Sequence, residues 1–137
     1  MYLLDTNVLS DGLKRRYPDL EAWLESQNAE DLFISNISLA EIAYGVHRLP
    51  DGKRNSELLT DLHLVRRRFG GRTLAVGAEV ALAYGEHQAA QVGKGRNDDP
   101  FASLLLVTAK TNDLIVATRN VSHYEDRGVG VVNPYQP

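Results

Sequence analysis

The chain contains no cysteine among its 137 residues, which excludes disulfide bonds and thiolate metal sites. It also has no apolar run near the roughly 20 residues that a membrane helix requires, so we expect no membrane segment. Its first residues carry no basic stretch ahead of an apolar run, and we therefore expect no secretory signal. Together these absences favour a cytoplasmic protein.

Hydrophobic residues make up 43% of the chain, which is enough to form a core. The length suits one domain, which we expect to span residues 1–137. The net charge of −3 neither predicts nor excludes binding to nucleic acid, because a local basic patch is enough to hold phosphates. Arg66–Arg68 and Arg72 form one such cluster, and a solvated helix face explains it equally well.

Short apolar runs alternate with longer helical patterns along the chain. This alternation predicts βαβ units and therefore a parallel sheet. Strands are expected at 3–4, 32–34, 74–76, 114–117 and 129–132, and helices around 10–26, 37–48, 53–69, 77–92 and 100–111.

Two helix starts carry recognisable capping signals. Ser38 and Glu41 stand three residues apart before apolar positions, which predicts a capping box. Asp99 precedes Pro100, which predicts an N-cap followed by proline at the first helical position. The stretch from Phe101 to Ala109 is apolar almost all round, so this last helix should be buried.

Two carboxylates fall near the same edge of the predicted sheet. Asp5 follows the first strand, and Glu41 lies in the first turn of the helix that follows the second. Ligands bind at the carboxyl ends of strands in such sheets. Paired carboxylates repel unless a proton or cation separates them, and Mg²⁺ or Mn²⁺ prefers oxygen ligands. Simpler roles stay open: Asp5 as a helix cap and Glu41 as a capping-box residue.

Thr118, Arg119 and Asn120 follow a fourth apolar run and should reach the same edge. Arg119 could hold a phosphate, and Asn120 could bind a metal through water or stabilise a turn. A receiver-like or small-molecule α/β domain would also place a lone aspartate after a strand, but would leave Glu41 and residues 118–120 unexplained. None of the four histidines has metal-ligand spacing to another, so no zinc site is expected.

Three segments of the chain form a recognisable set: Leu4-Asp5-Thr6-Asn7-Val8-Leu9-Ser10, Ile37-Ser38-Leu39-Ala40-Glu41-Ile42-Ala43-Tyr44-Gly45 and Val116-Ala117-Thr118-Arg119-Asn120. They resemble the signature blocks of PIN-domain proteins, in the right order and spacing, and the group they resemble most is the VapC-type toxins of toxin–antitoxin systems. The closing stretch Val132-Asn133-Pro134-Tyr135 is also similar to the tail of that group, so the resemblance covers essentially the whole chain.

The resemblance implies a three-layer α/β/α fold with a five-stranded parallel sheet. It implies a Mg²⁺- or Mn²⁺-dependent endoribonuclease that cleaves structured RNA such as tRNA or ribosomal RNA. Such a protein is a homodimer, or a toxin–antitoxin hetero-oligomer with a cognate VapB-type antitoxin. Asp5 and Glu41 match the family's metal-binding residues and Asn120 its last polar catalytic position, with supporting roles for Thr6, Asn7, Ser38, Thr118 and Arg119.

One position departs from the family pattern. Residues 102–109 align without a gap with a block that begins with a catalytic, metal-binding aspartate, and here that position is Ala102. Ala102 is an engineered inactivating change, a natural loss, or a change for which Asp98 or Asp99 compensates. The sequence therefore predicts an inactive or impaired nuclease, with a catalytically silent RNA- or antitoxin-binding module as the alternative.

Overall fold

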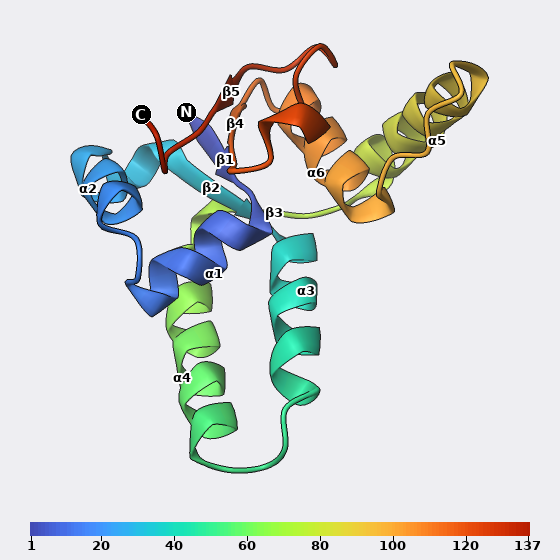
Figure 1. Ribbon diagram of the computed structural model, residues 1–137. Helices are drawn as coiled ribbons and strands as arrows, with labels where there is room; N and C mark the ends of the chain where they lie inside the picture. Colours follow the sequence, from blue (N-terminus) through green and yellow to red (C-terminus); the bar gives the residue numbers. More distant parts are fainter.

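The computed structural model describes residues 1–137 and has one parallel five-stranded sheet at its centre (Figure 1). The strands are ordered β3-β2-β1-β4-β5. They are β1 (Tyr2–Leu4), β2 (Leu32–Ser35), β3 (Thr73–Leu74), β4 (Ile115–Ala117) and β5 (Val131–Val132). The helices are α1 (Thr6–Lys14), α2 (Pro18–Ser26), α3 (Asn36–His47), α4 (Lys53–Arg68), α5 (Ala78–Gly93) and α6 (Pro100–Thr111), with 3₁₀ turns η1 (Ala29–Asp31), η2 (Gly70–Arg72) and η3 (Val121–His123).

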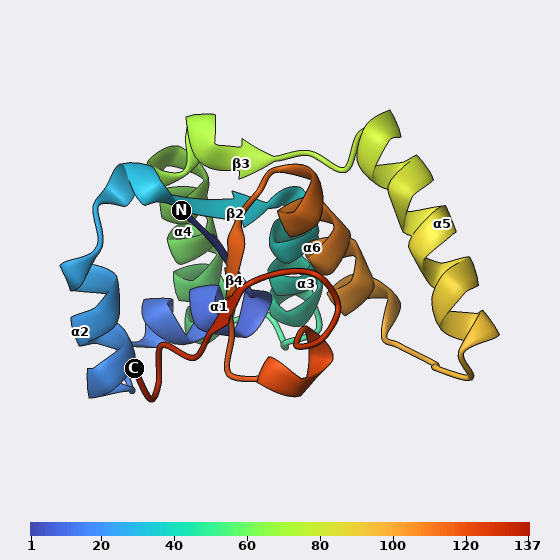
Figure 2. The same ribbon diagram turned by 90° about the horizontal axis from the view of Figure 1, so that it is seen from above.

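The two faces of the sheet bury separate apolar clusters. Successive side chains of a strand point to opposite faces, so Leu4 of β1 packs in one cluster and Leu3 in the other. The Leu4 face also buries side chains of α1, α2 and α4, whereas the Leu3 face packs against α6 (Figure 2). This arrangement confirms the three-layer α/β/α fold expected from the resemblance.

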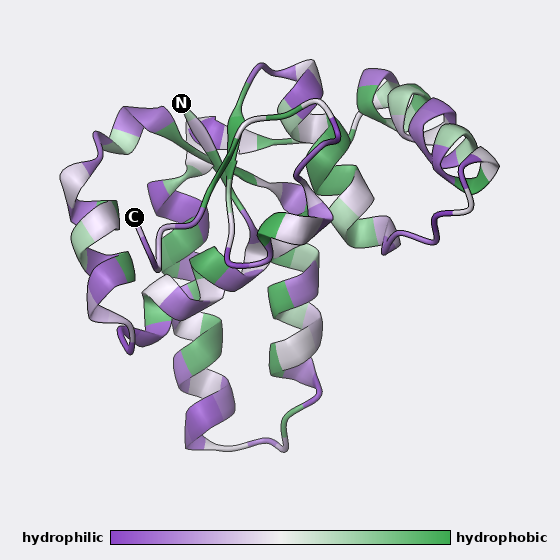
Figure 3. Ribbon diagram, turned by 45° about the horizontal axis from the view of Figure 1, so that its top comes forward, coloured by the Kyte–Doolittle hydropathy of each residue, from purple (hydrophilic) through white to green (hydrophobic).

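Two parts of the chain extend away from these layers. Helices α3 and α4 form a hairpin that projects below the sheet, and α5 packs along α6 at one side (Figure 1). In Figure 3 the strands are coloured as hydrophobic, whereas the far end of the hairpin is hydrophilic. No helix is both long and apolar enough to cross a membrane.

Two of the expected helix starts are wrong. Instead of one helix over 10–26, the chain forms α1 and α2, separated where Arg15 adopts a left-handed φ of 50° ahead of Pro18. Pro18 occupies the first position of α2, where its missing N–H costs nothing. Helix α3 begins two residues before Ser38, and the side chain of Ser35 caps it by accepting from Ile37 N at 3.1 Å.

Other local predictions are confirmed. Asp99 is the N-cap of α6, its carboxylate accepts from Ala102 N, and Pro100 takes the first position. Six residues of α6 are buried, as its apolar pattern indicated. The arginines of the basic cluster have different environments. Arg66–Arg68 form the last turn of α4, whereas Arg72 donates to the backbone carbonyls of Ala29, Leu32 and Arg68.

We expect the burial of α6 to dominate stability. Leu105→Ala should lower the free energy of unfolding by about 2–5 kcal/mol, because Leu105 is 1% exposed and its loss leaves a cavity. Leu82→Ala in α5 is the matched control and should change stability by less than about 0.5 kcal/mol, since Leu82 is 78% exposed. Urea unfolding followed by circular dichroism measures both, and equal losses would contradict the assignment of the core.

Candidate functional site

A hollow of about 100 Å³ lies where four elements meet. It is bounded by the residues after β1 and β4 and by the N-terminal turns of α3 and α6. This is the carboxyl edge of the sheet, where parallel α/β folds bind ligands. The lining residues are Asp5, Thr6, Asn7, Glu41, Asp99, Phe101, Ala102, Leu105, Asn120, His123 and Tyr124.

Asp5 is fixed in the hollow by both of its carboxylate oxygens. Oδ1 accepts from Thr6 N at 2.7 Å, so Asp5 also caps α1. Oδ2 accepts from Thr118 Oγ1 at 2.6 Å, and Thr118 is fully buried after β4. Thr118 Oγ1 in turn accepts from Asn120 N at 2.9 Å. Asp5 therefore caps α1 and lines the hollow at the same time, so its role as a helix cap does not exclude a functional role.

Glu41 is joined to the start of α1 through a short hydroxyl relay. Thr6 Oγ1 donates to Glu41 Oε1 at 2.7 Å and lies 2.8 Å from Ser38 Oγ. Because the single proton of Thr6 is directed at Glu41, Ser38 is the donor to Thr6. Ser38 and Glu41 thus do not form the expected capping box, and instead they position one face of α3 against α1.

Burial raises the pKa of both Asp5 and Glu41. Burial is the main cause for Asp5, opposed by the hydrogen bonds from Thr118 and Thr6. Burial also raises the pKa of Glu41, and the negative charges of Asp5 and Asp99 add to that rise against the Thr6 hydrogen bond. The three carboxyl groups therefore share one field of negative charge.

No lysine or arginine of the chain forms an ion pair with these carboxylates. The three ion pairs of the protein join Lys53 to Glu57, Arg119 to Asp11 and Arg127 to Asp98, and none includes Asp5, Glu41 or Asp99. No lysine or arginine lines the hollow. Ala102 lines it with a methyl group where the family pattern has a carboxylate. No three His, Cys, Asp or Glu side chains converge into a ready-made metal cage.

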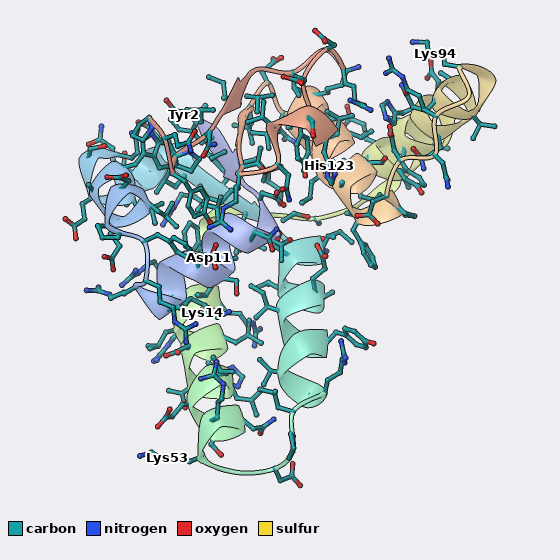
Figure 4. The ribbon with its side chains drawn as sticks, in the orientation of Figure 1. Tyr2, Asp11, Lys14, Lys53, Lys94 and His123 are labelled. Atoms are coloured by element: carbon teal, nitrogen blue, oxygen red, sulfur yellow. The ribbon has the colours of Figure 1, made fainter.

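Two lining residues with polar side chains were not predicted for the site from the sequence. Tyr124 is 1% exposed, and its phenol interacts with the Asp5 carboxylate; burial and the charge of Asp5 both raise the pKa of Tyr124. His123 lies beside the hollow at the end of η3 (Figure 4), and its charge lowers the pKa of Asp5. Only their closeness in sequence to residues 118–120 could have indicated that they belong to the site, because neither forms part of a recognisable motif.

Arg119 does not line the hollow, and neither do the predicted residues Ser38, Thr118 and Asp98. Its guanidinium lies 4.7 Å from the ring centre of Tyr17 and 4.1 Å from that of Tyr135, and it pairs with Asp11 at 3.4 Å. Cation–π contacts of this kind stabilise a corner of the fold. The cluster attaches the segment after β5 to α1, whose Asp11 is labelled in Figure 4. Arg119 therefore supports the structure at a distance from the hollow.

A second and larger depression, of about 450 Å³, lies between α1, α2 and α4. Its lining is mostly apolar and includes Val8, Leu24 and Phe69. None of the residues predicted at the sheet edge lines it, whereas Arg68 and Arg72 of the basic cluster do. Size alone would favour this depression, but the chemistry favours the smaller hollow, since converging polar groups with perturbed pKa values identify a reactive site.

Comparison with known proteins agrees with this geometry. The family model of the PIN domain matches residues 2–125. The chain is 31% identical to the VapC ribonuclease Y4jK of Sinorhizobium fredii, with 100% of the chain and 99% of the relative covered. It is 34% identical to the toxin FitB of Neisseria gonorrhoeae over 98% and 99%. The crystal structure of FitAcB from the same organism superimposes with a TM-score of 0.91, at 33% identity and full coverage of both chains. The chain therefore belongs to the PIN-domain family.

Proposed function

We propose that this protein is the toxin of a toxin–antitoxin pair and a Mg²⁺- or Mn²⁺-dependent endoribonuclease whose activity is impaired by Ala102. The observation that supports it best is the hollow itself, where Asp5, Glu41 and Asp99 lie together and none forms an ion pair with a lysine or arginine. The similarity to a VapC ribonuclease supports the same reaction class.

The donor set of the hollow fits a hard divalent cation. Asp5 and Glu41 offer carboxylate oxygens, and Mg²⁺ is usually held by one or two carboxylates while it keeps several waters. We propose that Asp5 and Glu41 hold the ion, with Asn120 at the rim contacting it through water. Bound there, Mg²⁺ would polarise a phosphate oxygen and lower the pKa of a water molecule.

Other side chains in or beside the hollow would position these ligands and contact the RNA. Thr118 and Thr6 keep the Asp5 carboxylate in one orientation through its two oxygens. Thr6 fixes Oε1 of Glu41, which would leave the other oxygen to hold the ion or to orient the attacking water. The exposed Asn7 and Asn120 side chains can donate to phosphate oxygens of the RNA. Arg119 is not assigned to phosphate, because its guanidinium is held by Asp11 and two tyrosines.

Ala102 is the reason to expect impairment. A carboxylate at this position would enter the hollow from the first turn of α6 and face Asp5 and Glu41. Its absence removes one ligand or proton-handling group, and each 1.36 kcal/mol of lost transition-state stabilisation lowers the rate about tenfold. The same observation favours the second candidate function, a silent module that binds RNA or an antitoxin without cleaving.

The partner we propose is a cognate antitoxin of the VapB or FitA kind. The relative FitB is a toxin, and its structure was solved as FitAcB. Structured RNA, such as tRNA or a ribosomal RNA loop, is the proposed substrate. Homodimerisation stays a prediction of the resemblance.

Glu41→Gln should stabilise the metal-free protein at neutral pH. The raised pKa of Glu41 means that the folded state loses stability as pH rises above the unfolded-state pKa, and glutamine removes that loss while still accepting from Thr6. The advantage should vanish in acid, where both states are protonated. Urea midpoints across pH measure it, with Glu86→Gln on the exposed face of α5 as control.

Added Mg²⁺ should make the unmodified chain more stable than Glu41→Gln. At a concentration ten times its Kd, the ion should stabilise the unmodified chain by about 1.4 kcal/mol. Glu41→Gln should gain much less, because one ligand is gone. An equal gain in both proteins would contradict a role for Glu41 in holding the ion.

Ala102→Asp should raise Mg²⁺- or Mn²⁺-dependent cleavage of a structured RNA by at least about tenfold, since a single ligand is worth one or more factors of ten in rate. Cleavage of a labelled tRNA pool, resolved on a gel, measures it. Ala81→Asp on the exposed face of α5 adds the same charge away from the hollow and should change nothing. Adding Asp5→Asn to Ala102→Asp should abolish the gain.

No cleavage by either chain, together with tight RNA or antitoxin binding, would overturn the nuclease assignment. That result would establish the silent module instead. Cleavage by the unmodified chain at a rate equal to that of Ala102→Asp would contradict impairment while leaving the reaction class intact.

A further inference from the structure

Helix α6 is preceded by two adjacent aspartates that the structure places in different environments. Asp98 is used by the fold: Arg127 Nη2 donates to its Oδ1 at 3.1 Å and Arg127 Nε to its Oδ2 at 3.3 Å. The side chains of Arg127 and Asp98 are only 15% and 20% exposed. Two-point pairing of this kind fixes a carboxylate firmly. Asp98 therefore ties the loop between β4 and β5 to the start of α6 and does not line the hollow.

Asp99 turns the other way and lines the hollow. Its Oδ2 accepts from Ala102 N at 3.2 Å, whereas its Oδ1 accepts no hydrogen bond from the protein. No lysine or arginine pairs with it. Its charge adds to the rise in the pKa of both Glu41 and Tyr124, which places it in the same electrostatic field as Asp5. One oxygen of Asp99 is thus free to face a cation.

We propose that Asp99 supplies the third carboxylate of the divalent-cation site, in place of the side chain absent at Ala102. The inference rests on the proposed metal-dependent nuclease. Positions 99 and 102 lie one turn apart at the start of α6, so both face the same side of the helix. The hydrogen bond from Ala102 N ties the Asp99 carboxylate to the backbone of Ala102, and both residues line the hollow.

In this arrangement Asp99 would bind the ion without taking part in proton transfer. Asp99 can complete the charge of the site from the N-cap, because one of its oxygens is free. Its other oxygen remains committed to the helix backbone, so it cannot shift freely to meet a water or a leaving group. The protein should therefore keep a metal site while cleaving RNA poorly.

Asp99→Asn is the decisive variant, because asparagine caps a helix as well as aspartate does and removes only the charge. Asp98→Asn is the matched control, with the same chemical change one residue away and outside the hollow. Mn²⁺ is the probe: the full-length chain is titrated and free Mn²⁺ is followed by electron paramagnetic resonance, with calorimetry as a second readout. Urea unfolding without metal verifies that both variants fold.

We expect Asp99→Asn to weaken Mn²⁺ binding by at least about tenfold, the lower end of the loss seen when groups that merely support a metal ligand are removed. Asp98→Asn should shift the affinity less than about threefold and should instead lower stability, because a largely buried ion pair is broken.

Three results would overturn the assignment. If Asp99→Asn binds Mn²⁺ as tightly as the unmodified chain while Asp5→Asn does not bind, Asp99 is no ligand and the proposed function stands. If the unmodified chain fails to bind but Ala102→Asp binds, Asp99 does not compensate. If neither chain binds Mn²⁺, both the role of Asp99 and the metal-dependent function fall.

Discussion

The hydrogen bond from Thr118 Oγ1 to Asp5 Oδ2 is the contact on which the rest of the site depends. It joins the ends of the neighbouring strands β1 and β4, and Thr118 is fully buried. With the backbone bond from Asp5 N to Ala117 O, it fixes the N-cap of α1 at the sheet edge. Thr6 then brings Ser38 and Glu41 of α3 to the same place. Remove this contact, and a buried carboxylate loses one of the donors that make its charge tolerable.

The order of strands and helices could be predicted from the sequence because the apolar runs are short and the helical patterns long. The residues at which individual helices begin and end could not be predicted. Nothing in the local pattern separates Ser35 from Ser38 as the cap of α3, since both are serines three residues apart. The break before Pro18 depends on a left-handed Arg15, a conformation that few sequences announce.

The candidate site, too, could be predicted only in part from the sequence. Asp5 and Glu41 could be placed at one edge because both follow parallel strands, and the structure brings them into one hollow. Arg119 was expected nearby, but the rings of Tyr17 and Tyr135 hold its guanidinium, and neither tyrosine is adjacent to it in sequence. The different environments of Asp98 and Asp99 depend on Arg127, almost thirty residues later, so no local reading could separate them. Long-range partners decide what a charged side chain does.

The unpaired negative charge of the hollow makes its two proposed ligands interdependent. Without a cation, Asp5, Glu41 and Asp99 repel an RNA phosphate, so the backbone of the substrate has no favourable place there. With a cation bound, the same hollow attracts it. By thermodynamic reciprocity, RNA must then raise the affinity for the ion by the same factor as the ion raises the affinity for RNA. On the proposed function, the carboxylate cluster thus binds nucleic acid only when a metal ion is present.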